Sequence, residues 1–249
     1  MESAGYSEKF RIRSFEMDAM GRASLQTICN FLQEIAGIHA ERLGVSVMEL
    51  LRHGLTWVLS RLHLRMHVYP RWGETITIET WPSGMSGMFG LREFSIRNDK
   101  NDVIGMATTS WMVLDIAAKK AIELPAFISA IPIVRPERII EDNFHKLPVP
   151  KDPPHKAVFS VRRSDLDINH HVNNVSYIEW AAEAIPAEMM KNHFLAGCEI
   201  SYRAECHYGD RILSECAPDK DGTGLLHVLK READQSQVAV VRTALKPAR

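Results

Sequence analysis

The 249-residue sequence has no apolar run approaching the ~20 residues that a membrane-spanning helix needs. It also has no excess of one charge, because 30 Lys and Arg residues stand against 31 Asp and Glu residues. Without a basic cluster, the chain is not expected to bind a nucleic-acid backbone. Its first residues, MESAGYSEKF, lack the basic-then-apolar pattern of a secretory signal. We therefore predict a cytoplasmic protein that binds neither a membrane nor nucleic acid.

Cysteine is scarce, with four residues and no CxxC pair. A chain of this length buries a core without disulfides, so we expect four reduced thiols. Among the histidines, His63 and His67 have the spacing of two metal ligands on a helix. They instead alternate with apolar residues, which predicts the solvated face of a strand, and no third ligand is evident.

Prolines are concentrated in one stretch, since seven of the 12 lie between Pro125 and Pro154. This stretch shows neither helical nor strand periodicity, which is typical of a linker. We predict an N-terminal domain at residues 1–124, a proline-rich linker at 125–156 and a C-terminal domain at 157–249.

The two predicted domains repeat each other. The segment FRIRSFEMDAMGRAS that begins at Phe10 resembles FSVRRSDLDINHHVNN at Phe159, a shift of 149 residues (159 − 10). Further on, Trp72-Gly73-Glu74 resembles Tyr208-Gly209-Asp210, a shift of 136 (208 − 72). The first half is therefore 13 residues longer (149 − 136) between these landmarks. A short helix that opens at Ser46, with a capping-box spacing, is expected to account for the difference.

Each half is predicted to contain a helix followed by antiparallel strands. Apolar residues recur at helical spacing over 25–43 and again over 175–189, where Pro186 is expected to end or bend the helix. Alternating runs follow in both halves, and one of them is placed at 200–205. A helix and a sheet can each bury one apolar face against the other. We predict an α+β fold of two helix-wrapped antiparallel sheets that form a pseudo-dimer.

The densest polar cluster spans residues 164–174, between a predicted strand and the second-half helix. Asp and Asn are common in such places merely because they cap helices and form turns. The repeat provides a control, because a purely structural need would give both halves similar residues. The candidate residues and their first-half counterparts are Asp167 (Asp18), Asn169 (Met20), His171 (Arg22) and Glu205 (Tyr69). Only the aspartate is retained, which favours chemistry in the second half.

The chain resembles the acyl-acyl carrier protein thioesterases of bacteria and plant plastids over nearly its whole length. The resemblance rests on Trp57–Arg61, Tyr69–Glu74, Glu79–Trp81, Leu166–Tyr177 and Tyr202–Cys206. It implies two hotdog folds in tandem, with a degenerate first domain that shapes the substrate pocket and a catalytic second domain. It also implies no metal or organic cofactor. The implied substrate is a fatty acyl chain in thioester linkage to the phosphopantetheine arm of acyl carrier protein.

By this resemblance, Asp167, Asn169, His171 and Glu205 fall on the family's catalytic positions. Glu205 is the expected base, placed on a strand beside an apolar channel where desolvation would raise its pKa. The Asn169 amide is suited to orienting the thioester carbonyl. His171 is expected to hold the attacking water or protonate the leaving sulfur, while Asp167 fixes the imidazole or the loop.

Several alternatives stay open on the sequence alone. In a competing scheme, Cys206 is the nucleophile and His171 its base. Acyl-coenzyme A presents the same thioester, and a non-catalytic acyl-binding module or a hotdog dehydratase has the same type of fold. Association of two copies into a homodimer is also left open.

Overall fold

The computed structural model describes residues 5–133, 135–167, 170–220, 222 and 224–247. Its contacts divide the chain into two compact units, Met1–Asn143 and Phe144–Arg249, which we call unit 1 and unit 2. None of the described helices is both long enough and apolar enough to cross a membrane. All four cysteines are buried free thiols, as predicted.

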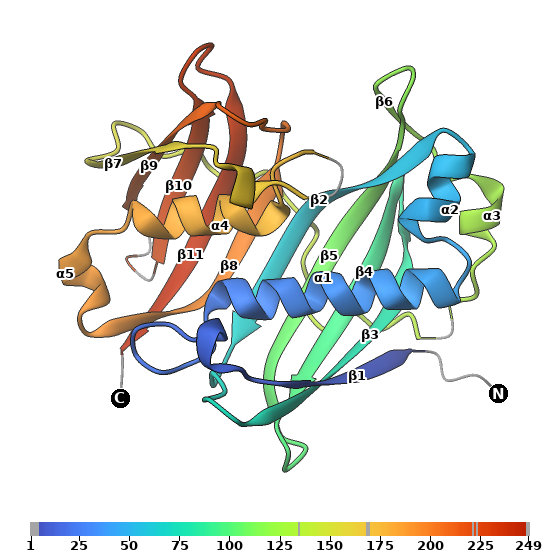
Figure 1. Ribbon diagram of the computed structural model, residues 1–249, viewed down its shortest axis with the longest axis horizontal. Helices are drawn as coiled ribbons and strands as arrows, with labels where there is room; N and C mark the ends of the chain where they lie inside the picture. The colour runs from blue at the N-terminus through green and yellow to red at the C-terminus, as the bar shows by residue number, and fades with distance from the viewer. Residues whose placement is uncertain (1–4, 134, 168–169, 221, 223, 248–249) are drawn as a thin grey trace. The chain divides into compact units, whose positions relative to one another are not determined.

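Unit 1 consists of one long helix on an antiparallel sheet. Its strands are β1 Tyr6–Arg11, β2 Leu55–Met66, β3 Thr75–Ser86, β4 Phe89–Arg97, β5 Val103–Asp115 and β6 Lys120–Ile122. Its helices are α1 Leu25–Arg42, α2 Val47–Arg52, α3 Ala126–Ser129 and the 3-10 turn η1 Ser14–Glu16. The strand order is β1-β3-β4-β5-β2, with β6 paired to β5. Figure 1 shows α1, in blue, lying across this sheet.

Unit 2 has the same plan. Its strands are β7 His155–Ser160, β8 His193–Tyr202, β9 Arg211–Pro218, β10 Gly224–Arg231 and β11 Gln237–Pro247. Its helices are α4 Asn174–Glu183, α5 Ala187–Met190 and the 3-10 turn η2 Arg163–Asp165. The strand order, β7-β9-β10-β11-β8, matches that of unit 1 strand for strand, and α4 packs across the sheet (Figure 1).

The strand register confirms the repeat. In unit 1, Phe10 of β1 lies opposite Ile76 of β3, and in unit 2, Phe159 of β7 lies opposite Ile212 of β9. These pairs keep both sequence shifts, 149 for the phenylalanines (159 − 10) and 136 for the isoleucines (212 − 76). The prediction of two helix-wrapped antiparallel sheets is therefore confirmed.

The helix α2 accounts for the different lengths of the two halves, as predicted. Shifted by 149, α1 spans positions 174–191, which contain both α4 and α5; shifted by 136, β2 ends at position 202, where β8 ends. Residues 42–54, which include α2, therefore have no counterpart in unit 2. Pro186 divides the unit 2 helix into α4 and α5, because its ring would clash with a carbonyl four residues earlier in a continuous helix. It stands as the N-cap of α5.

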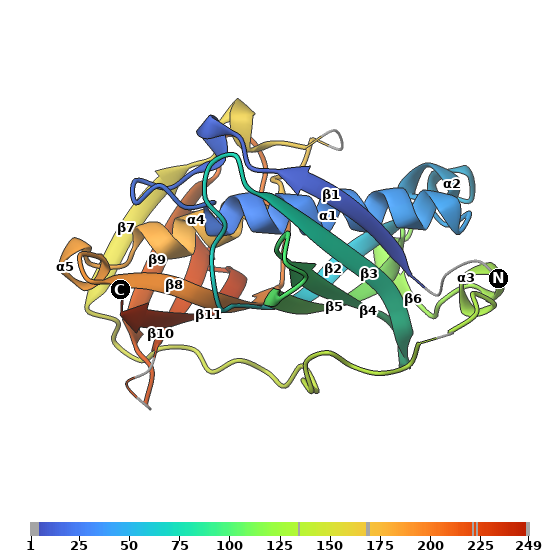
Figure 2. The same ribbon diagram turned by 90° about the horizontal axis from the view of Figure 1, so that it is seen from below.

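A polar core lies on the face of the unit 1 sheet that is turned away from α1. Figure 2 shows residues 135–143 running along that side. The Glu93 side chain is fully buried there and accepts hydrogen bonds from Ser83 Oγ at 2.8 Å and Thr108 Oγ1 at 2.9 Å. Arg138, from the covering segment, places its Nε 2.6 Å from the Glu93 carboxylate. The segment is thus attached to the sheet by a buried ion pair.

The same segment changes the environment of His63. We predicted a solvated strand face, but the His63 side chain is buried. Its Nδ1 lies 2.7 Å from Asp142 Oδ2, and its Nε2 accepts a hydrogen bond from Arg65 Nε at 3.0 Å. The prediction was wrong for His63 because residues 135–143 cover this part of β2.

His227 of β10 is fully buried in unit 2, with its Nε2 2.9 Å from Thr243 Oγ1. Burial lowers the pKa of this imidazole to about 3. When unfolded, the residue titrates near 6.5, so between these values only the unfolded chain binds the proton. Lowering the pH through this range therefore favours unfolding.

We expect His227→Gln to reduce this acid sensitivity. Urea unfolding of the wild type should lose roughly 2 kcal/mol more stability between pH 7 and pH 5 than the variant does. Glutamine keeps a group that can bond to Thr243 but has no titratable proton. Equal losses in the two proteins would show that His227 does not cause the effect.

Candidate functional site

Two loops of unit 2 lie side by side. Residues 161–173 lead from β7 to α4, and residues 203–210 lead from β8 to β9. Val161 N donates to Asp210 O at 2.8 Å, and Val172 N donates to Cys206 O at 3.1 Å. These two bonds bring the predicted residues His171 and Glu205 together although 34 positions separate them (205 − 171).

Asp167 shapes the first of these loops. Its backbone N–H donates to His171 O at 2.8 Å, and its Oδ1 accepts from His171 N at 3.3 Å. His170 N also donates to Asp167 O at 3.1 Å, and His170 has a left-handed φ of 61°. The aspartate thus stabilises the turn that presents His171.

Unit 1 contains the same turn without the imidazole. Asp18 N donates to Arg22 O at 2.7 Å, and Arg22 N donates to Asp18 Oδ1 at 3.0 Å. Gly21 has a left-handed φ of 72°, and the Arg22 guanidinium folds back to pair with the Asp18 carboxylate at 3.0 Å. The shared aspartate therefore stabilises the turn, whereas the side chain four positions later is arginine in unit 1 and histidine in unit 2.

His171 and Glu205 form an accessible pair. The distance from His171 Nε2 to Glu205 Oε2 is 3.6 Å, and the two side chains are 41% and 52% exposed. The ring of His207 stands perpendicular to that of His171, with centroids 5.3 Å apart. His207 carried no signal in the sequence, because it belongs to no periodic pattern or recognised motif. The structure therefore adds a second imidazole to the predicted pair.

The environment predicted for Glu205 was wrong. We placed it on a strand in an apolar, desolvated setting, but β8 ends at Tyr202 and Glu205 lies in the following loop. Half of its side chain is open to solvent. Another predicted residue, Asn169, lies outside the described residues.

The main chain at Glu205 is anchored from β10. Arg231, the last residue of β10, donates from Nη2 to Glu205 O at 2.6 Å. The same guanidinium contacts Asp210 Oδ2 and Asp234 Oδ2, each at 3.2 Å. Sequence reasoning missed this role, since nothing in a lone arginine at a strand end indicates what its guanidinium contacts. Arg231 therefore holds the loop that carries Glu205.

Cys206 adjoins this pair, but its thiol is fully buried. Burial raises the pKa of the thiol, which disfavours the thiolate needed for nucleophilic attack. Tyr177 of α4 interacts with the cysteine and donates from its hydroxyl to Ala204 O at 3.2 Å. This environment is typical of a packing cysteine rather than of a reactive one.

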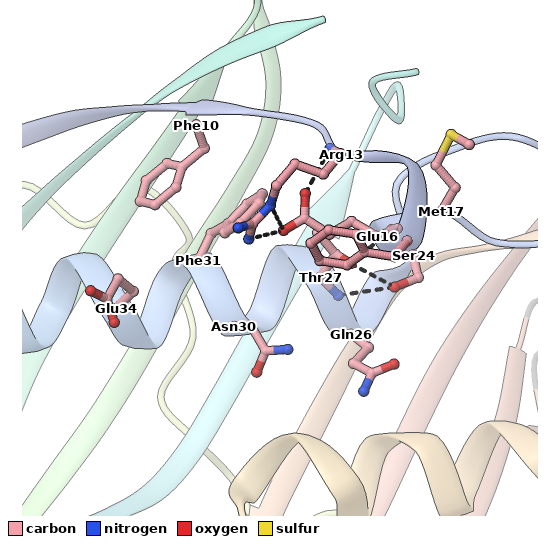
Figure 3. A pocket seen from close by; sticks show the side chains of 11 residues that line it. Phe10, Arg13, Glu16, Met17, Ser24, Gln26, Thr27, Asn30, Phe31 and Glu34 are labelled. Carbon is pink, nitrogen blue, oxygen red and sulfur yellow. Dashed lines mark hydrogen bonds and ion pairs between the residues drawn. The ribbon is translucent and has the colours of Figure 1, made fainter. Parts of the chain in front are cut away.

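A separate pocket of about 580 Å³ lies in unit 1, between β1, η1 and α1 (Figure 3). Its apolar wall includes Phe10 and Phe31, whose rings stack with centroids 4.5 Å apart. Its polar wall includes Arg13, which pairs with Glu16. Of the predicted site residues that the structure describes, none lines this pocket. The pocket is therefore distinct from the His171–Glu205 pair.

Comparisons with known proteins agree with the resemblance seen in the sequence. Residues 3–131 match the model of the acyl-ACP thioesterase N-terminal domain, and residues 150–245 match that of the C-terminal domain. The chloroplastic oleoyl-acyl carrier protein thioesterase of Coriandrum sativum is 31% identical over 237 residues. The match covers 88% of this chain and 64% of the coriander protein, so the chain spans less than two thirds of that relative.

Solved structures confirm the predicted double hotdog fold. An acyl-ACP thioesterase from Bacteroides thetaiotaomicron VPI-5482 is 26% identical and superposes with a TM-score of 0.89, covering 98% of this chain and 99% of the other. The 12:0-ACP thioesterase from Umbellularia californica, at 23% identity, has the same fold with a TM-score of 0.88 over 100% of this chain and 99% of its own. With both domain models matched in order along one chain, this protein belongs to the acyl-ACP thioesterase family.

Proposed function

We propose that the protein is a thiolester hydrolase that cleaves fatty acyl-acyl carrier protein into free fatty acid and holo carrier protein, which terminates fatty acid synthesis. Family membership supports this proposal. The observation that carries it is the His171–Glu205 pair, 3.6 Å apart. The loop that carries His171 has a unit 1 counterpart with the same backbone turn but an arginine in place of the histidine.

The proposed reaction needs an activated water molecule. At a separation of 3.6 Å, His171 Nε2 and Glu205 Oε2 can both contact one water at hydrogen-bonding distance. Glu205 accepts a proton as the water oxygen bonds to the thioester carbon. The tetrahedral intermediate then expels the sulfur, and the proton passes through His171 to the leaving thiolate. The products are a carboxylic acid and a thiol, which balances the addition of one water.

Two further residues complete the proposed site. Asp167 positions the turn, which supports a role in holding His171 rather than in proton transfer. Asn169 is proposed to donate from its amide to the thioester oxygen as negative charge develops there. We therefore propose the same four site residues as the sequence predicts: Asp167, Asn169, His171 and Glu205.

The protein is proposed to act in the cytoplasm on carrier-bound substrate, with no metal or organic cofactor in the reaction. The predicted domains 1–124 and 157–249, with the linker 125–156, are proposed to divide the work between substrate pocket and catalysis. Formation of a homodimer stays open.

A release assay tests the proposal. Purified protein is incubated with a ladder of saturated and monounsaturated acyl chains on acyl carrier protein, and free fatty acid is quantified. We expect release with a maximum at one chain length, and a higher kcat/KM for an acyl carrier protein than for the coenzyme A thioester of the same chain.

The other outcomes identify the rivals. A preference for the coenzyme A thioester would make the protein an acyl-CoA thioesterase. Saturable acyl binding without release would indicate a non-catalytic binding module. Formation of an enoyl product from a hydroxyacyl carrier protein would indicate a dehydratase.

A further inference from the structure

The candidate site contains one more metal-binding group than the proposed hydrolysis uses. His171, Glu205 and His207 each place a ligand atom within 4.8 Å of those of the other two. Two imidazoles and one carboxylate are donors that zinc and its neighbours in the first transition series bind well. All three side chains are at least partly exposed, so an ion can enter from solvent.

The spacing is close to that of a tetrahedral site. Bonds of about 2.0–2.1 Å to nitrogen and oxygen place neighbouring ligand atoms roughly 3.4 Å apart. His171 Nε2 and Glu205 Oε2 already stand at 3.6 Å. The His207 ligand atom lies within 4.8 Å of both, so it needs to move inward by at most about 1.4 Å to reach such spacing. Because the His207 side chain is exposed and its ring stands edge-on to that of His171, a side-chain rotation can bring it inward.

The backbone beneath each ligand is held in place. The turn at Asp167 fixes His171, the Arg231 guanidinium fixes Glu205 O, and His207 N donates to Asp210 Oδ2 at 3.0 Å. Because the three backbones are already held in place, the ligand residues lose less conformational entropy when they bind an ion. The donors are therefore brought together before an ion binds.

The donor set belongs to unit 2 alone. The two sequence shifts place Arg22, Tyr69 and Arg71 at the unit 1 positions of His171, Glu205 and His207. Two of these are cationic and repel a metal ion. Unit 1 therefore serves as an internal negative control for the site.

We propose that His171, Glu205 and His207 form a binding site for a divalent transition-metal ion of the zinc class, and that occupancy inhibits hydrolysis. The ion takes the Glu205 carboxylate that accepts the proton from water and the His171 nitrogen that relays it. The inhibitory half of this proposal rests on the proposed function, whereas binding itself does not. Removal of the ion by a chelator restores the reaction.

Calorimetric titration with Zn²⁺ tests binding without substrate. Tag-free wild-type chain is compared with His207→Gln, which removes one ligand from the surface, and with His170→Asn as the matched control. His170 is exposed in the same loop, and asparagine tolerates its left-handed backbone. We expect one saturable site in the wild type and in His170→Asn. In His207→Gln, affinity should fall at least about tenfold, the lower range for loss of even an outer-shell partner.

The release assay, repeated with Zn²⁺, tests inhibition. Wild type and His170→Asn should be inhibited at the concentration that saturates the calorimetric site, whereas His207→Gln, measured against its own rate without zinc, should need at least about tenfold more zinc for the same fractional inhibition. No saturable binding, or equal affinity in His207→Gln, would overturn the site. Saturation that leaves hydrolysis unchanged or speeds it would overturn the inhibitory role. A chain inactive without zinc but showing the binding differences would refute the proposed function and leave the metal site standing.

Discussion

Replacement of Glu205 by glutamine is expected to lower kcat/KM for acyl-acyl carrier protein hydrolysis by about 10²–10⁴-fold, the contribution of a general base. Glutamine has nearly the same shape but cannot accept a proton from water. The side chain is 52% exposed, so the fold should be unaffected. Steady-state release of fatty acid from the best carrier substrate provides the measurement, with thermal unfolding as the check on folding.

The neighbouring cysteine is the matched control. Cys206→Ala removes the thiol next to Glu205 but leaves both charged groups in place, so substantial turnover should remain. Its fully buried side chain means that some loss of stability accompanies the change. Loss of turnover in folded Cys206→Ala, together with an active Glu205→Gln, would replace attack by water with attack by the thiol.

The second large effect concerns stability. Glu93→Ala is expected to lower the free energy of unfolding by about 3–5 kcal/mol, because it leaves the Arg138 guanidinium without its buried partner. It also removes the acceptor for the hydroxyls of Ser83 and Thr108. Urea unfolding followed by far-ultraviolet circular dichroism measures the change.

Two further variants define the cause. Glu93→Gln keeps an acceptor for the hydroxyls but removes the charge, so its loss should be intermediate. Glu232→Ala breaks the exposed ion pair with Arg211 and should not measurably shift the unfolding midpoint. If Glu93→Ala behaved like Glu232→Ala, the buried pair would not be what attaches residues 135–143 to the sheet.

Most of the fold could be predicted from the sequence because both halves repeat the same pattern of helix and strands. The two shifts, 149 and 136, recur in the register of the paired strands β1 and β3 in unit 1 and β7 and β9 in unit 2. Strand β8 was harder to place, since His193–Tyr202 is covered on both faces and shows no simple alternation. His63 was misjudged because its partner, Asp142, lies 79 positions away. Contacts at that distance leave no local pattern in a single sequence.

The candidate site was predictable only where the two halves differ. Comparison with Arg22 and Tyr69 singled out His171 and Glu205, and the structure brings these two together. The comparison did not single out His207, because its counterpart Arg71 is also a polar loop residue. The comparison of the two halves also could not predict the exposure of Glu205, because this exposure depends on where β8 ends.

The duplicated turn has a consequence for how such proteins diversify. Its shape comes from the main chain and one aspartate, so the imidazole it displays is not needed to build it. An ancestor with two equal units can therefore lose the catalytic side chains of either one through a few substitutions while both helix-wrapped sheets persist. Because the fold does not depend on the catalytic side chain, a few substitutions can remove the activity, and a few can also restore it.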